Sequence, residues 1–133
     1  LPSLLMITIS ETPYEHDISV RRGDTLRVEF LLEDVDYTGY TFKCEVRDRI
    51  TKRHIMTMTP IFEGFAAGDS TISLSKSATQ TDVRAGSYMY DIAAIDELDQ
   101  DYDIIYGLMT ISDDVTLNIP NLLEDDDGGI IVG

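Results

Sequence analysis

The chain has no tryptophan, a single cysteine and four prolines among its 133 residues, and its apolar runs are short. The lone cysteine, Cys44, excludes an intrachain disulfide. No run approaches the roughly 18 apolar residues that a membrane-spanning helix needs. Residues 1–5 lack a charged leader followed by an apolar stretch, so no secretion signal is expected. These absences favour one globular domain that is held together by its own core.

The chain also lacks the common motifs of catalysis and cofactor binding. It has no glycine-rich phosphate loop, no dinucleotide fingerprint and no nucleophile elbow. Neither His16 nor His54 has a second histidine or cysteine at a spacing suited to zinc. Cys44 is expected on an inward strand face between Phe42 and Val46, where a thiol is inert. The sequence therefore predicts a protein that is not an enzyme and that carries no cofactor.

Basic residues are missing from the last third of the chain. Ten Lys and Arg against 25 Asp and Glu give a formal net charge of −15. All ten basic residues lie between Arg21 and Arg84, whereas residues 85–133 hold 12 acidic residues and no basic one. Binding to phosphate groups needs clustered Lys and Arg. The charge therefore argues against nucleic acid and anionic membranes as partners.

The dominant periodicity is two, which is typical of strands that cover a core on one side. Residues 25–32 and 40–47 alternate apolar and polar side chains, and shorter alternations follow around residues 72–74 and 88–94. The stretch 104–111 is almost wholly apolar, and Gly107 within it indicates a bulge or a close backbone approach. The predicted inward side chains are Leu26, Val28, Phe30, Leu32, Tyr40, Phe42, Cys44, Val46, Ile72, Leu74, Tyr88, Tyr90, Ile92 and Ala94.

Short strands separated by turn residues predict an all-β protein: an immunoglobulin-like antiparallel β-sandwich of about seven to nine strands. The exception to the strand pattern is a one-turn helical crossover expected near residues 76–84, which Gly86 would stop. The predicted organisation is an N-terminal strand or arm (1–16), the sandwich (17–117) and an acidic C-terminal tail (118–133) that ends in the apolar residues 130–132.

Three blocks of sequence resemble a known family. Arg22-Gly23-Asp24-Thr25-Leu26 opens one strand, and the run Tyr37-Thr38-Gly39-Tyr40-Thr41-Phe42-Lys43 leads into the next. Ile72-Ser73-Leu74-Ser75, Ala85-Gly86 and Tyr88-Met89-Tyr90-Asp91-Ile92 form a strand, a crossover and a strand. In order and spacing, residues 17–117 resemble the immunoglobulin-like sandwich domains of tailed-phage tail and baseplate proteins, similar to the N-terminal domain of baseplate upper proteins.

This resemblance implies a non-enzymatic structural protein of the virion, in the tail, baseplate or neck region, made in the host cytoplasm. Its expected partners are other virion proteins and further copies of the same chain. The alternative is a host-surface module that binds glycan or protein, for which Tyr37, Tyr102 and Tyr106 are the aromatic candidates.

Charged segments supply the candidate partner-binding residues. The basic stretch holds Arg47, Arg49, Lys52 and Arg53, and an acidic protein surface is its preferred partner. The acidic candidates are Asp99, Asp101 and Asp103 in one loop and Glu124, Asp125, Asp126 and Asp127 in the tail. A plain solvated loop explains each stretch as well. Asp99, Asp101 and Asp103 fail the pattern of a calcium-binding loop, because Ile104 stands where glycine is needed and Thr110 where glutamate is needed. A looser calcium site that also uses Asp96 and Glu97 stays open.

Overall fold

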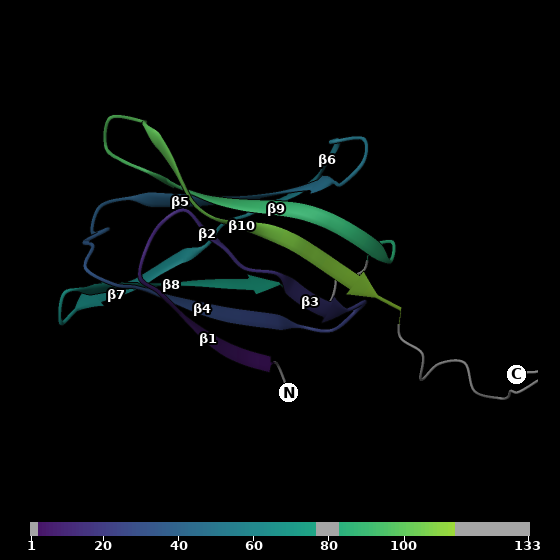
Figure 1. Cartoon of the computed structure of the whole chain (residues 1–133), viewed down its shortest axis with the longest axis horizontal. Coiled ribbons are helices and arrows are strands. Elements are labelled where there is room, and N and C mark those ends of the chain that lie inside the picture. The colour runs from purple at the N-terminus through teal and green to yellow at the C-terminus, as the bar shows by residue number, and fades with distance from the viewer. Residues whose placement is uncertain (1–2, 77–82, 114–133) are drawn as a thin grey trace, which may run out of the picture.

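The computed structural model describes residues 3–76 and 83–113, and these residues form two packed β-sheets with no helix (Figure 1). The all-β prediction and the two-layer architecture are confirmed, consistent with an immunoglobulin-like sandwich. Accordingly, the part of the chain that is described holds no helix able to cross a membrane. The ten strands are β1 (Ser3–Ile9), β2 (Tyr14–Glu15), β3 (Ile18–Arg21), β4 (Leu26–Leu32), β5 (Thr41–Asp48), β6 (His54–Met58), β7 (Ile61–Ala66), β8 (Asp69–Lys76), β9 (Gly86–Ile95) and β10 (Asp101–Ser112).

The first sheet has four strands in the order β1-β4-β8-β7. Strand β1 runs parallel to β4, in a register from Ser3 opposite Leu26 to Ile9 opposite Leu32. The N-terminal segment therefore belongs to this sheet at least as far as Ile9. The two other pairs, β4 with β8 and β7 with β8, are antiparallel.

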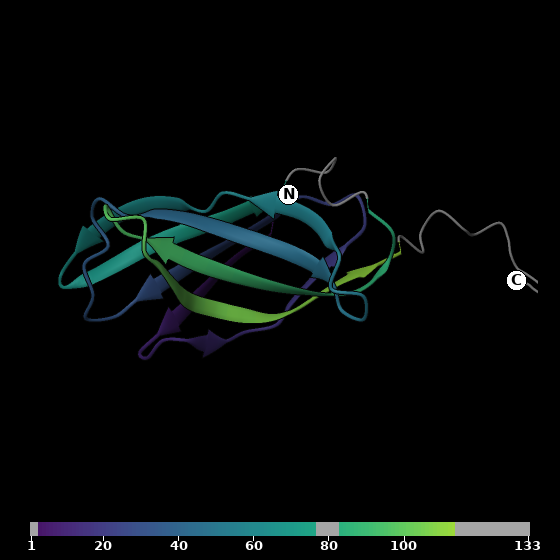
Figure 2. The same ribbon diagram turned by 90° about the horizontal axis from the view of Figure 1, so that it is seen from above.

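The second sheet follows the order β2-β10-β9-β5-β6, and β3 also pairs with β10. Both β2 and β3 run parallel to β10, whereas the remaining pairs are antiparallel. The prediction of a purely antiparallel sandwich is therefore corrected at three strand pairs. Figure 2, seen from above, shows the two layers lying over one another.

Alternation along the strands builds the core as expected. In β4 the predicted inward residues Leu26, Val28, Phe30 and Leu32 are all buried, while the residues between them are partly exposed. In β5 the same holds for Phe42, Cys44 and Val46, but Tyr40 precedes the strand and is only partly buried. The predicted residues of β8 and β9 are buried too: Ile72, Leu74, Tyr88, Tyr90, Ile92 and Ala94.

One local prediction needs correction, and another is confirmed in one of its two forms. The one-turn helix expected near residues 76–84 is not borne out, since Lys76 ends strand β8 and residues 77–82 lie outside the described part. Of the two readings of Gly107, a bulge or a close backbone approach, the close approach is confirmed, because the backbone of His16 passes directly over Gly107. The bulge in β10 lies between Asp103 and Ile105. The predicted tail, including Glu124–Asp127 and residues 130–132, also lies outside the described residues.

Candidate functional site

Four connections between strands lie at one end of the sandwich, which we call the loop end: residues 10–13, 33–40, 67–68 and 96–100. Figures 1 and 2 show the last three of these connections at the same end of the molecule. The Ser10 hydroxyl donates a hydrogen bond to Glu33 Oε1 (2.8 Å). The backbone N–H of Asp34 donates to Asp69 Oδ1 (3.1 Å). These bonds join segments far apart in sequence into one surface.

Hydrogen bonds within the β4–β5 connection and to Ser70 of β8 hold this connection in place. The carboxylate of Asp36 accepts a hydrogen bond from the backbone N–H of Thr38 (2.9 Å), and hydrogen bonds from Thr38 hold the pKa of Asp36 below its usual value. Ser70 Oγ, buried in β8, accepts from the N–H of Tyr37 (2.9 Å) and donates to the carbonyl of Val35 (2.8 Å). Tyr37 is thereby anchored to the core at both its backbone and its ring.

The β9–β10 connection is organised by Asp96. Its Oδ1 accepts hydrogen bonds from the backbone N–H groups of Leu98 (2.8 Å) and Gln100 (3.0 Å). These bonds, the one from Gln100 foremost, lower the pKa of Asp96. The hydroxyl of Tyr102 lies 3.1 Å from Asp96 Oδ2 and 2.9 Å from Gln100 Oε1. The hydrogen bond to Asp96 raises the pKa of Tyr102 and holds the ring in place.

A cavity of about 410 Å³ opens between these connections, and we call it the tyrosine cavity. Tyr37 is almost fully buried, and its ring meets the Tyr40 ring edge to face, with centroids 5.0 Å apart. Tyr102 is 45% exposed, so part of its ring is open to a ligand. The cavity is lined by Thr12, Val35, Tyr37, Tyr40, Tyr102, Asp103 and Ile104.

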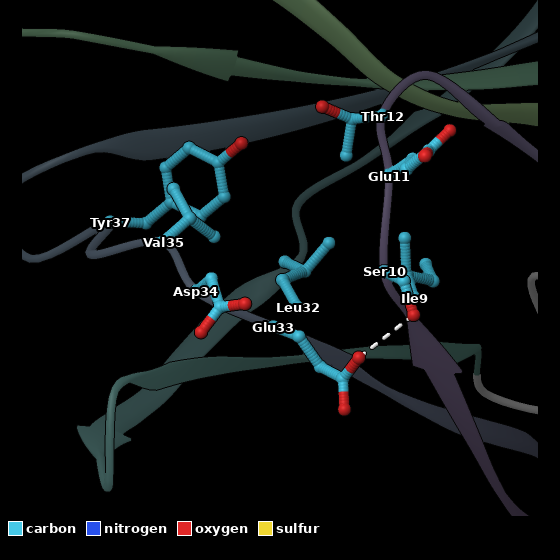
Figure 3. A pocket seen from close by; sticks show the side chains of 9 residues that line it. All are labelled: Ile9, Ser10, Glu11, Thr12, Leu32, Glu33, Asp34, Val35 and Tyr37. Atoms are coloured by element: carbon cyan, nitrogen blue, oxygen red, sulfur yellow. Dashed lines mark hydrogen bonds between the residues drawn. The ribbon is translucent and has the colours of Figure 1, made fainter.

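A second cavity of about 220 Å³ adjoins the first, and the two share Thr12, Val35 and Tyr37 as lining residues. Figure 3 shows Tyr37 and Val35 on one side of this cavity and the segment from Ser10 to Thr12 on the other. Its remaining lining residues are Ile9, Glu11, Leu32, Glu33 and Asp34. The two cavities form one continuous lining across the loop end.

The charge around both cavities has one sign. The four connections, residues 10–13, 33–40, 67–68 and 96–100, hold one, three, no and three acidic residues, which makes seven carboxylates, and no Lys, Arg or His. Asp69 begins β8, and Asp101 and Asp103 begin β10, directly after these connections. Crowded carboxylates produce a strong negative potential at the mouth of a cavity. Among the described residues, no group of three or more His, Cys, Asp and Glu side chains is placed to hold a metal ion.

The structure separates the two predicted sets of partner-binding residues. Asp99 lies in the β9–β10 turn with a φ of 63°, and Asp101 and Asp103 begin strand β10, so all three belong to the loop end. The basic candidates cluster in and beside the β5–β6 turn at the opposite end of the sandwich (Figures 1 and 2). These candidates are Arg47, Arg49, Lys52 and Arg53. Within one chain the basic turn therefore cannot reach the acidic loop.

The aromatic candidates separate in the same way. Tyr37 and Tyr102 share the tyrosine cavity, as the glycan alternative would require. Tyr106 instead lines a separate hollow of about 120 Å³, beside Glu45, Arg47 and Asp91 on the outer face of the second sheet. Tyr40 was expected on an inward strand face and instead lines the tyrosine cavity. Its position at the predicted strand start, beside a glycine turn, was the signal that could have placed it there.

Cys44 is buried on the inward face of β5, as predicted, and its thiol is not placed to act as a nucleophile. Its side chain is fully buried, and desolvation raises the pKa of the thiol to about 12. The two histidines lie apart: His16 packs its ring edge against Phe30, while His54 Nε2 lies 2.8 Å from Thr57 Oγ1 and 3.4 Å from Glu45 Oε1. No arrangement of these residues supplies a base beside a nucleophile.

Comparison with known proteins identifies no family: no family model and no curated protein matches the sequence. Among solved structures, the cysteine protease inhibitor EhICP2 from Entamoeba histolytica is similar at 8% identity and a TM-score of 0.43, over 81% of this chain and 96% of that chain. PbICP-C, in its complex with falcipain-2, is similar at 11% identity and a TM-score of 0.44, over 82% and 98% of the two chains. Amebosin is similar at 8% identity and a TM-score of 0.42, over 83% and 99%.

These comparisons correct the predicted phage relationship. The similar solved structures include cysteine protease inhibitors rather than tail or baseplate proteins, and the partner present in one of them is a protease. The predictions of a virion structural role, of virion partners including further copies of the chain, and of a phage host-surface module are therefore wrong. Likeness at this level of identity and TM-score gives no argument about function, so the function is argued from the loop end itself.

Proposed function

We propose that the protein is a non-enzymatic binding domain whose loop end holds a basic segment of a partner protein. The observation that carries this proposal is the pairing of a tyrosine-lined cavity of about 410 Å³ with seven carboxylates and no basic residue in the four connections of the loop end. Cavities of this size, lined by aromatic side chains and a few polar groups, are typical ligand sites.

Charge selects the class of partner. The negative charge of the loop end repels acidic surfaces and nucleic acid, whereas it attracts a basic segment as that segment approaches. The carboxylates of Glu33, Asp69 and Asp96 already accept hydrogen bonds within the loop end. Glu97 and Asp99 lie in the β9–β10 connection and Asp101 begins β10, and pairing these carboxylates with Lys or Arg would relieve their mutual repulsion.

Rigidity supports a binding role over a merely solvated set of loops. The first three connections are tied to each other through Ser10–Glu33 and Asp34–Asp69 and to the core through Ser70, and the β9–β10 connection is held by Asp96. A surface already held in one arrangement loses little conformational entropy when a partner binds.

The proposal is tested by fluorescence anisotropy with two labelled peptides of equal length, one carrying four Lys or Arg residues and the other carrying Glu at the same positions. The intact chain is expected to bind the basic peptide, more weakly as salt rises, and not the acidic one. The double variant Asp101→Asn/Asp103→Asn should weaken binding about tenfold.

The matched control is Asp24→Asn/Asp113→Asn, which removes the same net charge away from the loop end. It should change affinity less than about twofold, because charge beyond a Debye length is screened. Equal losses in the two variants, or no binding of the basic peptide at low salt, would refute the proposal. Inhibition of falcipain-2 by the chain, without binding of basic peptides, would also refute it.

A further inference from the structure

We infer that the basic turn between β5 and β6 binds the acidic segment at residues 124–127 of the same chain. The basic turn comprises residues 47–53, which hold four Lys and Arg residues and one acidic residue, Asp48. It lies at the end of the sandwich opposite the loop end, so this inference stands independently of the proposed function.

Hydrogen bonds hold the backbone of the basic turn in one arrangement. Asp48 Oδ1 accepts from the N–H groups of Thr51 (2.8 Å) and Ile50 (2.9 Å), and these bonds, the one from Thr51 foremost, lower the pKa of Asp48. The N–H of Asp48 donates to the carbonyl of Arg53 (2.8 Å) and closes the hairpin. The one carboxylate of the turn is thus used by the backbone of the turn.

The side chains at the tip of the turn offer positive charge and apolar surface together. Arg49, Lys52 and Arg53 form no ion pair within the part of the chain that the structure describes. Ile50, between them in sequence, is 85% exposed. Such a surface is complementary to an acidic segment that has apolar neighbours.

One stretch of the sequence has this composition. Leu122 and Leu123 precede four consecutive acidic residues at 124–127, and the chain has no other run of four acidic residues. Residues 114–127 hold five acidic residues and no basic one. The stretch lies outside the described residues. A partner for both the cations and the exposed isoleucine is therefore present in the same chain.

Strand direction places the end of β10 close to the basic turn. Strands β5 and β10 both pair antiparallel with β9, so they run in the same direction and finish at the same end of the sandwich. Asp48 lies opposite Tyr88, and Tyr88 lies opposite Met109, near the end of β10. Figures 1 and 2 both show the β5–β6 turn and the end of β10 at one end of the molecule.

The chain is long enough to make the contact. Only β9 separates β5 from β10, so these two strands lie about 10 Å apart. The residues from Asp113 to Glu124 can span about 36 Å when extended. Arg22 lies 3.8 Å from Asp113, so the path to the acidic segment also starts beside a basic residue. A tether of this length gives an effective concentration on the order of 1 mM, at which several weak ion pairs act together.

The test attaches a nitroxide spin label to the full chain through Gly128→Cys, directly after the acidic segment. Cys44 is buried, so the label reacts with the introduced cysteine alone. At low salt the amide signals of residues 49–53 are expected to lose more than about half of their intensity. Those of Leu98 and Gln100, at the loop end, should keep theirs, and about 1 M salt should restore the signals of the basic turn.

Two lysines of the β5–β6 hairpin form a matched pair of controls. Lys52 lies in the basic turn, whereas Lys43 lies near the start of β5, toward the loop end. Lys52→Gln should reduce the broadening about twofold, and Lys43→Gln, which removes the same charge, should leave it unchanged. The triple variant Arg49→Gln/Lys52→Gln/Arg53→Gln should abolish the broadening.

A second readout needs no label. The side-chain Nε–H signals of Arg49 and Arg53 should shift when the acidic segment is neutralised by Glu124→Gln/Asp125→Asn/Asp126→Asn/Asp127→Asn. Turn signals that keep their full intensity in the labelled chain at low salt would overturn the inference. Equal broadening of an isotope-labelled chain by a separate spin-labelled chain would also overturn it, because the contact would then join two copies.

Discussion

The carbonyl group of His16 occupies the space that a side chain at position 107 would need, and the same carbonyl oxygen accepts a hydrogen bond from the hydroxyl of Tyr90. His16 lies between β2 and β3, the two short strands that pair in parallel with β10. Its N–H donates to the carbonyl of Tyr106 (2.9 Å), and Asp17 Oδ1 accepts from the N–H of Leu108 (3.0 Å). Gly107 thus lets the chain cross β10 at contact distance.

Gly107→Ala should destabilise the protein, because the added Cβ would overlap the His16 backbone, which cannot rotate away as a side chain would. Overpacking of this kind costs about 1–3 kcal/mol in the free energy of unfolding. Urea denaturation followed by circular dichroism measures the loss.

Gly68→Ala is the control for this substitution. Gly68 has a φ of 85° and no atom within 4 Å of an added Cβ, so its cost arises only from the left-handed backbone. About 1 kcal/mol is expected there. A stability for Gly107→Ala equal to that of the unmodified protein would contradict the close approach.

Cys44 should resist alkylation while the protein is folded. Burial raises the pKa of its thiol to about 12, so at pH 8 almost none of it is thiolate, the form that reacts. Labelling with iodoacetamide, followed by mass spectrometry, should be at least about 100-fold slower in buffer than in denaturant. Rapid labelling under native conditions would show that the core around Cys44 opens.

Asp91→Asn should stabilise the protein near neutral pH. Partial burial, and then the neighbouring carboxylates of Asp103 and Glu45, raise the pKa of Asp91. An acid whose pKa is raised by folding destabilises the folded state when ionised, so stability is gained as the pH falls through that raised pKa. Solvent screens a half-buried group, and the expected gain from Asn is therefore only about 0.5 kcal/mol.

Thermal unfolding at pH 7 and at pH 3 provides the measurement. The advantage of Asp91→Asn should shrink at the lower pH, where the carboxyl of the unmodified protein is neutral. Asp101→Asn, an exposed neutralisation on β10, serves as the control and should have the smaller effect. A loss of stability at pH 7 in Asp91→Asn would contradict the expected sign.

Acid should loosen the β9–β10 connection at a pH below the ordinary titration of aspartate. Hydrogen bonds from Gln100 and Leu98 lower the pKa of Asp96 below 3.8, so the stabilisation is present above the unfolded-state pKa and is lost as the pH falls through the lowered one. The amide resonances of Leu98 and Gln100 should shift with a midpoint below pH 3.8, and the transition should vanish in Asp96→Asn. A midpoint at or above pH 3.8 would contradict the hydrogen bonds from Leu98 and Gln100 to the Asp96 carboxylate.

The predictable part of the fold is the part governed by alternation. The strands around Phe30, Cys44 and Tyr90 were predicted with the correct inward faces, because a sheet with one buried face imposes a period of two on any sequence. The parallel strands β1, β2 and β3 were not predicted as such, because strand direction depends on where the chain crosses between sheets. The path by which the chain crosses between the sheets cannot be predicted from the local sequence.

The candidate site was predictable only in fragments. Asp99, Asp101 and Asp103 were marked by their charge, and Tyr37 and Tyr102 by being aromatic in polar surroundings. Thr12, Val35 and Tyr40 complete the tyrosine cavity, but only Tyr40, beside the turn at Gly39, has a neighbourhood that marks it. The predicted family, by contrast, rested on turn and strand patterns that many unrelated sandwiches share.

The sequence by itself determined an all-β chain with one buried face per strand, an inert cysteine and an excess of negative charge, because these follow from composition and from the period of two. Only the tertiary structure decided that four separate connections meet at one end, that three tyrosines face one cavity there, and that the basic turn lies at the other end. Those relationships depend on the order in which strands pair, which brings residues some 90 positions apart, such as Thr12 and Tyr102, to the same cavity.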